Sequence, residues 1–382
     1  MATGGRKKRV AIVGGGPAGA TVALTLARRG VKTVVIETQS GPEPKIGECL
    51  PPNANPLLEQ LGLKNRLGGE DHLTSHGNRS LWGSSNPVER DFLFGTKGAG
   101  WQLDRLKFEQ TLATAAREQG AQWHYGYRLS ECLWQDGKWA LRVKTPTGDK
   151  HLEADFVVDA SGRVARLARQ FGARHIRYDR LIGVAALMKS EGGMGIKDSL
   201  TLVEAVASGW WYSARLPRDQ LIVIYMTDSD LVDHNAVRQT RDWFALLDAT
   251  EQTKRRALAG DYRPVSEPRI LPANSARLDK MTGERWLAVG DAAAAYDPLA
   301  SYGISAAMGA GFYAASAIAD SLEGDHQSLQ SYERILDLSY ARYLLMHQEY
   351  YGLERRWPDE TFWRRRHHYH QHSANYHGES LI

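Results

Sequence analysis

The pattern of apolar and polar positions near the N-terminus predicts a β-α-β unit. Residues 9–13 form a short β-branched run typical of a buried strand, and residues 20–29 carry apolar side chains at helical spacing. A second buried strand is expected over residues 31–37, and the glycine-rich segment 14–19 joins the first strand to the helix. A strand, a glycine turn, a helix and a strand in this order are typical of a nucleotide-binding fold.

The rest of the chain alternates between predicted strands and helices, which indicates an α/β protein. We expect a helix over residues 103–117 capped by Asp104, and a hairpin with Asp136-Gly137 as its turn. The alternation of Trp, Tyr, Val and Ile from 181 to 226 predicts a second sheet. The other expected elements are two buried strands, an alanine-rich helix and a helical, aromatic C-terminal segment, over residues 155–160, 285–289, 303–321 and 325–382.

Composition and charge narrow the class of protein. The chain has 382 residues, 42% of them hydrophobic and 24% charged, which excludes a disordered or fibrous chain. A net charge of +4 is too small for a dedicated nucleic-acid binder. The only cysteines, Cys49 and Cys132, have no metal-ligand spacing and cannot form a disulfide framework, so we expect a cytoplasmic protein without a metal. No apolar run reaches the roughly 18 residues of a membrane span.

The glycine-rich segment has the spacing that a dinucleotide requires. Gly14 permits the tight turn, Gly16 has no Cβ that would block a pyrophosphate, and Gly19 lets the helix pack on the strand. Pro17 and Ala18 lie between the last two of these glycines, just before the helix, whose N-terminus favours phosphate because its first N–H groups are unpaired. We therefore assign these five residues to cofactor binding.

An acidic residue closes the second strand of the unit. Glu37 follows Gly19 by 18 residues, where a carboxylate that binds a ribose diol is expected. Because a carboxylate repels a 2′-phosphate, FAD or NAD fits this position better than NADP.

Several motifs in a fixed order resemble the FAD-dependent monooxygenase and halogenase superfamily, which has a p-hydroxybenzoate-hydroxylase-like fold. They are GGGPAG at 14–19, Glu37, GECLPP at 47–52, Asp104 with Arg105, DASGR at 159–163 and GDAAAAYDPLASYGISAA at 290–307. The resemblance implies a Rossmann-like FAD-binding domain, an interleaved substrate domain built on an antiparallel sheet, and a helical C-terminus. The implied ranges are 1–70, 100–175 and 270–325 for the FAD-binding domain, 71–99 and 176–269 for the substrate domain, and 326–382 for the C-terminal region.

The resemblance also implies which residues contact the cofactor. Gly290 and Asp291 would meet the ribityl chain or the pyrophosphate, and the segment from Pro298 to Gly303 would pass along the isoalloxazine. Gly303 and Ile304 open the alanine-rich helix, where their N–H groups can stabilise the negative charge that collects on the flavin O2 upon reduction.

Arg105 is a candidate partner of the FAD phosphate, and an ordinary surface salt bridge is the alternative. Four further residues are candidates for the chemistry: Glu48, His76, Trp211 and Tyr302. Glu48 lies in the GECLPP motif near the flavin ring in this family, and structural support is its alternative role. His76 can act as an acid or base, or is an exposed loop histidine. Trp211 can form a wall for an aromatic substrate, or packs within a sheet. Tyr302 belongs to the segment that the resemblance places along the ring.

Two departures from the halogenase pattern favour oxygen insertion. Flavin halogenases carry a WxWxIP signature and a catalytic lysine. In the matching segment here, 210–217, Tyr212 and Ala214 occupy the two tryptophan positions. The region where the lysine would fall, 75–81, contains none. The sequence therefore predicts a monooxygenase that hydroxylates an aromatic, indole-type ring through a flavin C4a-hydroperoxide. A halogenase, a hydroxylase of a small aromatic metabolite and a flavin-dependent double-bond reductase remain alternatives.

Within the superfamily, the segments GECLPPNANPLL and GWWYSARLP resemble those of a branch that hydroxylates a tryptophan inside a precursor protein. That reaction belongs to tryptophylquinone cofactor biogenesis in enzymes such as glycine and lysine oxidases. The resemblance implies a precursor protein as partner and O2 as co-substrate. Because no second dinucleotide motif occurs, the reductant is NAD(P)H bound transiently or a separate flavin reductase.

The C-terminal segment, residues 350–382, is rich in arginine, histidine and aromatic residues. We expect a solvated or flexible helix end whose aromatic side chains form a docking surface. The aromatic residues concerned are Trp357, Phe362, Trp363 and Tyr369. His368 and His372 have the i, i+4 spacing of a zinc pair, but no nearby Cys, Asp or Glu completes a site.

Overall fold

The predicted β-α-β unit forms the centre of the first domain. The computed structural model describes residues 8–43, 45–92, 95–191, 195–325 and 327–373, with side chains up to His367. Strand β1 (Arg9–Val13) pairs in parallel with β2 (Lys32–Glu37), and helix α1 (Pro17–Arg28) connects them. Proline is favoured in the first turn of a helix because its missing N–H would have no partner there.

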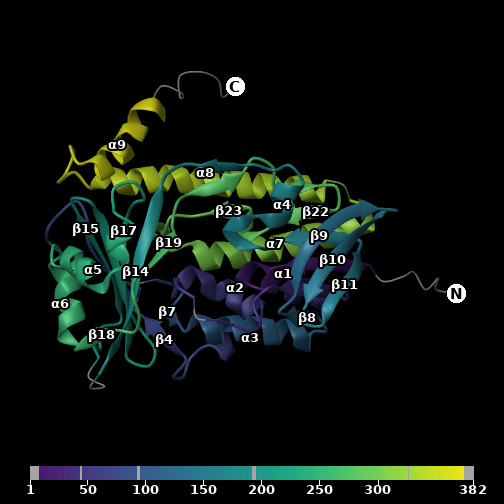
Figure 1. Ribbon diagram of the computed structural model, residues 1–382, viewed down its shortest axis with the longest axis horizontal. Coiled ribbons are helices and arrows are strands. Elements are labelled where there is room, and N and C mark those ends of the chain that lie inside the picture. Colours follow the sequence, from purple (N-terminus) through teal and green to yellow (C-terminus); the bar gives the residue numbers. More distant parts are fainter. Residues whose placement is uncertain (1–7, 44, 93–94, 192–194, 326, 374–382) are drawn as a thin grey trace.

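A six-stranded sheet extends this unit on both sides, in the order β21-β22-β12-β1-β2-β8. Helices α1, α3 (Arg105–Glu118) and α7 (Gly303–Glu323) pack on the nucleotide-binding part of the domain (Figure 1). Asp104 caps α3 as predicted, since its side chain accepts a hydrogen bond from the Lys107 amide at 3.1 Å. The added strands are β8 (Gln122–Tyr125), β12 (Phe156–Asp159), β21 (Thr282–Gly283) and β22 (Trp286–Ala288).

An eight-stranded sheet forms the other half of the molecule. Its outer face is covered by helices α5 (Thr240–Leu247) and α6 (Gln252–Ala259), and its inner face looks toward the first domain (Figure 1). Side chains alternate between the two faces along each strand. The strands are β5 (Gly77–Leu81), β6 (Val88–Asp91), β14 (Leu181–Ser190), β15 (Leu200–Val206), β16 (Gly209–Leu216), β17 (Gln220–Asp228), β18 (Tyr262–Pro264) and β19 (Arg269–Pro272).

Three small sheets and two short helices complete the two domains. The predicted hairpin joins β9 to β10, and both turn residues, Asp136 and Gly137, have positive φ values of 50° and 73°. The sheets comprise β3 (Cys49–Leu50), β7 (Gly100–Leu103) and β4 (His72–Ser75); β9 (Arg128–Gln135), β10 (Lys138–Thr145) and β11 (Gly148–Ala154); and β13 (His175–Arg177), β20 (Ala276–Leu278) and β23 (Ala294–Ala295). The helices are α2 (Asn55–Gln60) and α4 (Arg166–Gln170).

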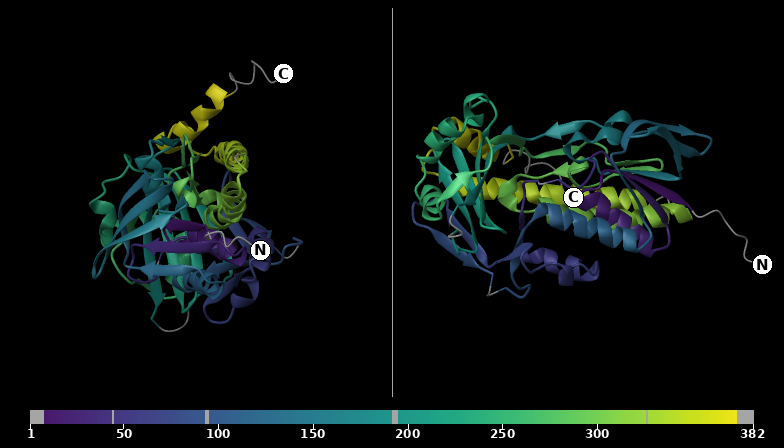
Figure 2. Two further views of the ribbon diagram at one scale, coloured as in Figure 1. Left: turned by 90° about the vertical axis from the view of Figure 1, so that its right-hand side faces the viewer. Right: turned by 60° about the horizontal axis from the view of Figure 1, so that its bottom comes forward.

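The C-terminal segment forms two helices, α8 (Ser328–Leu353) and α9 (Thr361–Ser373). Helix α8 runs along the length of the molecule and spans both domains (Figures 1 and 2). The α/β class and the helical C-terminus predicted from the sequence are confirmed. Within the described residues, we find no helix with the length and apolarity that a membrane crossing requires.

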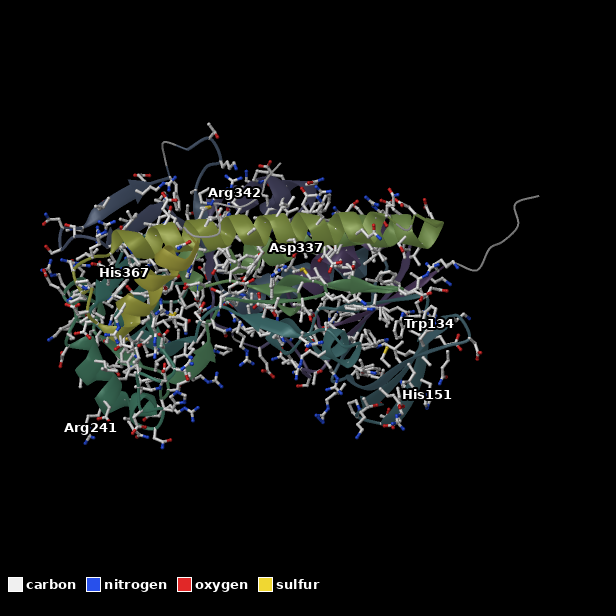
Figure 3. All side chains as sticks on the ribbon, turned by 90° about the horizontal axis from the view of Figure 1, so that it is seen from above. Trp134, His151, Arg241, Asp337, Arg342 and His367 are labelled. Carbon is white, nitrogen blue, oxygen red and sulfur yellow. The ribbon has the colours of Figure 1, made fainter. Side chains whose placement is uncertain are left out.

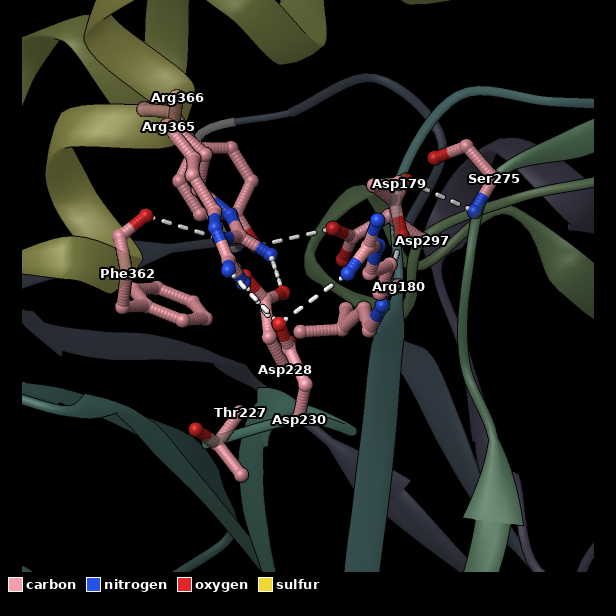
Figure 4. Close-up of polar contacts among 12 residues, drawn as sticks. Asp179, Arg180, Thr227, Asp228, Asp230, Ser275, Asp297, Phe362, Arg365 and Arg366 are labelled. Atoms are coloured by element: carbon pink, nitrogen blue, oxygen red, sulfur yellow. Dashed lines mark hydrogen bonds and ion pairs between the residues drawn. The ribbon is translucent and has the colours of Figure 1, made fainter. Parts of the chain in front are cut away.

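The prediction of an aromatic docking surface at the C-terminus is wrong for two of its residues. Phe362 and Trp363 are only 1% and 0% exposed and pack against the inner face of the eight-stranded sheet. Two ion pairs hold α9 on the sheet. Arg366 pairs with Asp228 at 2.8 Å, and Arg365 pairs with Asp230 at 2.7 Å (Figure 4). Tyr369 and the histidine pair His368 and His372 lie outside the described side chains.

Candidate cofactor site and active site

A cleft of about 580 Å³ lies between the two large sheets, within the size range of cofactor and ligand sites. The first domain contributes the glycine turn, the segment around Glu48 and the start of α7, and the second contributes the inner face of β14, β16 and β17. Nine of the residues predicted from the sequence line this cleft. They are Gly16, Pro17, Ala18, Glu48, Arg105, Asp291, Pro298, Gly303 and Ile304.

The glycines of the turn have different roles. A Cβ on Gly14 would lie 2.1 Å from the Ala160 carbonyl oxygen, and one on Gly19 would lie 2.0 Å from the carbonyl oxygen of Gly14. Packing within the protein therefore requires glycine at both positions. A Cβ on Gly16 would meet no protein atom within 4 Å, so only a ligand in the cleft can require glycine there. This open cradle at the N-terminus of α1 fits a pyrophosphate.

Glu37 lies beside the glycine turn at the end of β2. The Gly15 amide donates to Glu37 Oε2 at 2.7 Å, and the Gln39 amide donates to Oε1 at 2.9 Å. Each carboxylate oxygen has a second lone pair, so both can still accept a bond from a ribose hydroxyl. The backbone thus holds this carboxylate in a fixed orientation.

Arg105 at the start of α3 is held by the protein, yet one of its donors is unused. Its Nη1 donates to the Gly47 carbonyl at 2.8 Å, and its Nη2 pairs with Glu109 at 2.6 Å. The side chains of Arg105 and Glu109 are only 11% and 7% exposed, which excludes an ordinary surface salt bridge. The buried Nε has no hydrogen-bond partner among the described residues. A free N–H on a fixed cation fits a phosphate or another electron-rich part of a cofactor.

Glu48 is the most unusual ionisable group of the cleft. The preceding residue, Gly47, has a φ of 104°, and this turn places the Glu48 side chain in the interior, where the residue is 4% exposed. Its Oε2 has no hydrogen-bond partner in the described chain. Burial raises the pKa of Glu48 to about 7, although the charge of Arg105 opposes the shift. A carboxyl with this pKa can hold or release a proton near neutral pH.

Asp291 lies at the end of β22, in a short helical turn that begins at Gly290. Arg163 of the DASGR motif lies 3.6 Å from Asp291 Oδ2 and also donates to the Asn274 carbonyl at 2.6 Å. Burial raises the pKa of Asp291, while Arg163 and then Arg105 oppose the shift. Gly290 does not line the cleft: a Cβ there would lie 2.7 Å from the Cβ of Ala18, so its role is packing.

The loop that carries Pro298 is fixed by a buried aspartate. Asp297 accepts a bond from the Leu299 amide at 2.8 Å, and its Oδ2 lies 3.0 Å from His347 Nε2 and 2.9 Å from the Tyr351 hydroxyl. Burial opposes ionisation of Asp297, but these contacts, led by that of His347, hold its pKa below the usual value. Helix α8 thereby fixes the loop, a role that sequence analysis did not predict for either His347 or Tyr351.

Helix α7 begins in the cleft at Gly303 and Ile304. The first N–H groups of an α-helix have no partner within the helix, and the positive end of its dipole lies there. This is a suitable place for negative charge on a cofactor ring.

Three residues predicted for the chemistry lie away from the cleft. Trp211 is on the outer face of β16, where it is 1% exposed and stacks on Tyr225 at 4.9 Å. Its neighbour Tyr212 faces the cleft instead, because successive residues of a strand point to opposite faces. His76 is exposed and contacts Ser199 at 2.9 Å, and Tyr302 packs against a tyrosine cluster near α8.

A family model described as "FAD binding domain" matches residues 7–338, and the chain belongs to this family. It is 31% identical over 360 residues to a protein of Marinomonas mediterranea whose name describes it as the FAD-dependent oxidoreductase LodB, covering 93% of this chain and 96% of the relative. It is 25% identical to the flavin-dependent halogenase armH4 of Armillaria mellea, covering 88% of this chain and 70% of the relative.

Solved structures have the same fold. The FAD-dependent halogenase CndH superposes with a TM-score of 0.85 at 22% identity and covers 97% of this chain and 89% of its own. The peptidyl tryptophan dihydroxylase QhpG gives a TM-score of 0.76 at 23% identity and covers 94% and 79%. The chain is therefore a FAD-dependent enzyme of the monooxygenase and halogenase superfamily, and the FAD prediction is confirmed.

Proposed function

We propose that this enzyme is a monooxygenase that hydroxylates an indole-type ring, carried as a tryptophan side chain by a partner precursor protein. One observation carries the choice of oxygen insertion over halogenation. Within the described cleft lining the single lysine is Lys45, and its ammonium group pairs with Glu109 at 2.6 Å. Residues 75–81 contain no lysine, and the described lining of the cleft offers no unpaired ammonium group that could take the place of the halogenase lysine.

The geometry supports an assignment of the residues that would hold the cofactor. Gly16 and the N-terminus of α1 would receive the pyrophosphate, and Glu37 would bind the ribose. Arg105 would contact a phosphate, and Gly303 and Ile304 would face the pyrimidine side of the ring. Bound FAD, once reduced, supplies the electrons that activate O2 for transfer of one oxygen atom to the ring. The protein has to position the substrate, exclude water and manage protons.

Glu48 is the proposed proton-handling group. It is buried beside the ring end of the cleft, its Oε2 is free, and its pKa of about 7 matches the working pH of a general acid. The opposite wall is apolar, with Ile224, Met226 and Leu271, and it limits the access of water. Tyr212 completes this wall and can contact an aromatic substrate by its ring.

Two comparisons support the proposal of a protein-borne substrate. QhpG, which has the same fold, acts on a peptidyl tryptophan according to its title. A brominase of Pseudoalteromonas luteoviolacea, 25% identical, acts on a ring that a peptidyl-carrier protein holds, according to its name. Presentation of a ring by another protein is thus found among the relatives.

A coupling experiment tests the substrate. The FAD-loaded enzyme is given reduced flavin and O2, first alone, then with free tryptophan, then with an immature tryptophylquinone-oxidase precursor from the source genome. We expect peroxide release in the first two cases and efficient oxygen transfer in the third, since the precursor has to close the cleft. Well-coupled hydroxylation of free tryptophan, or no transfer to the precursor, would contradict the proposal.

Halogenation is the second candidate, because several relatives are named halogenases, among them armH4 and the structural neighbour CndH. The two candidates differ in the atom that appears on the ring, which mass spectrometry detects directly.

A further inference from the structure

Helix α8 is apolar on two opposite faces. Its inner face packs against the first domain and the cofactor loop through buried residues such as Tyr332, Tyr340 and Tyr351. Its outer face lies at the edge of the molecule in Figure 1. This face carries large aliphatic side chains that are exposed. They are Ile335 (42% exposed), Leu338 (63%), Leu345 (59%) and Leu353 (57%). A helix with apolar residues on both faces is typically covered on both faces.

Two opposite charges lie on the same outer face. Arg342 and Glu349 continue the spacing of three or four residues that relates the aliphatic side chains, so all six share one stripe. Figure 3 shows Arg342 on the open side of α8. Both residues are exposed, and no hydrogen bond or ion pair is found for either among the described residues. Asp337, by contrast, is already paired with Arg277.

We propose that this stripe, Ile335 to Leu353, binds the same stripe of a second copy of the chain, with the two α8 helices antiparallel. A twofold axis between Leu345 and Met346 would place Leu338 opposite Leu353 of the second copy. The same register places Arg342 opposite Glu349 of the second copy, and symmetry forms this pair twice. A parallel arrangement in register would bring Arg342 against Arg342, so the charges select the antiparallel one.

The size of the stripe sets the strength of the dimer. From Leu338 to Leu353 the helix rises about 23 Å, at about 1.5 Å per residue. A contact between two such helices is small compared with a standard interface, so we expect association in the micromolar range. The cleft lies on the other side of α8, so each copy keeps a complete cofactor site.

A charge-swap series tests the proposal on the full-length, FAD-loaded protein. Sedimentation velocity over a range of concentrations should show a monomer–dimer equilibrium for the wild type. Arg342→Glu and Glu349→Arg should each raise the dissociation constant at least tenfold, because each creates two like-charge pairs. The double variant should restore the wild-type value. Leu345→Glu should abolish the dimer.

Leu258→Glu is the matched control, because this leucine is 66% exposed on α6, far from the stripe. It should leave the dissociation constant unchanged, and the flavin spectrum and Tm should show that every variant is folded. A monomeric wild type at all concentrations would overturn the proposal, even if Leu345→Glu weakened precursor binding. A dimer that survives Leu345→Glu would also overturn it, and failure of the double variant to restore the dimer would overturn the antiparallel register.

Discussion

The two ends of the cofactor cleft are built by different means. The nucleotide end is formed by residues that are neighbours in sequence. Close backbone contacts require glycine at positions 14 and 19, whereas the space beside Gly16 is open. At the ring end, residues distant in sequence meet, and Asp297 is held by His347 and Tyr351 from α8. On the proposed assignment, a local motif forms the phosphate site, whereas long-range packing holds the loop beside the flavin ring.

The largest expected effect is at the nucleotide end. Gly16→Val would place a branched side chain in the path of the pyrophosphate, so we expect loss of FAD binding in the flavin spectrum. Because no protein atom lies near this position, the Tm of the apoprotein should hardly change.

Gly14→Ala is the control for that experiment. Its Cβ would clash with the Ala160 carbonyl, and its φ of 108° is unfavourable for alanine, so it should lower the Tm of the apoprotein as well. Equal apoprotein stability for the two variants would contradict the division of roles among the glycines.

The glycine turn is the part of the candidate site that could be predicted from the sequence. The motif 14–19 and Glu37 were predictable because their spacing is local and their conformational demands belong to glycine itself. The position of Trp211 was not, since one residue of register exchanges the two faces of β16 and brings Tyr212 to the cleft. His347 and Tyr351 could not be assigned either, because their partner Asp297 lies some fifty residues earlier in the chain.

Trp363 of α9 packs on the sheet that forms one wall of the cleft, and we expect it to contribute strongly to stability. It is fully buried, and its Nε1 donates to the Val206 carbonyl at 2.9 Å. Trp363→Ala should lower the free energy of unfolding by about 3–5 kcal/mol, measured by urea titration. Removal of residues 353–382 should therefore prevent folding, because it removes the buried side chains of α9. A stable, FAD-loaded truncated protein would contradict the structural role of α9.

Glu48→Gln should reveal the buried carboxyl through the pH dependence of apoprotein stability. The Glu48 pKa rises from 4.5 to about 7 on folding, so the wild type loses stability as pH increases between these values. Glutamine does not titrate. From pH 4.5 to about 7, the free energy of unfolding of the variant should rise by about 3 kcal/mol relative to that of the wild type. Above pH 7 this difference should stay constant. A difference that is independent of pH would contradict the assigned pKa.

The smallest expected effect comes from the contact between α8 and the cofactor loop. Tyr351→Phe removes the hydroxyl that donates to Asp297 and accepts from Trp210, and should lower stability by about 1–3 kcal/mol. FAD affinity should change little, whereas the yield of product per reduced flavin should fall, because the ring-side loop is less fixed. Unchanged stability and coupling would contradict the role given to this hydroxyl.

The most direct test of the account supplies the enzyme with reduced FAD, ¹⁸O₂, chloride, bromide and the immature precursor together, followed by mass spectrometry of the tryptic peptides. We predict that a single tryptophan gains oxygen that carries the ¹⁸O label, with no halogen. The isotope doublet of chlorine or bromine on that ring, or a label found only in peroxide and water, would contradict it.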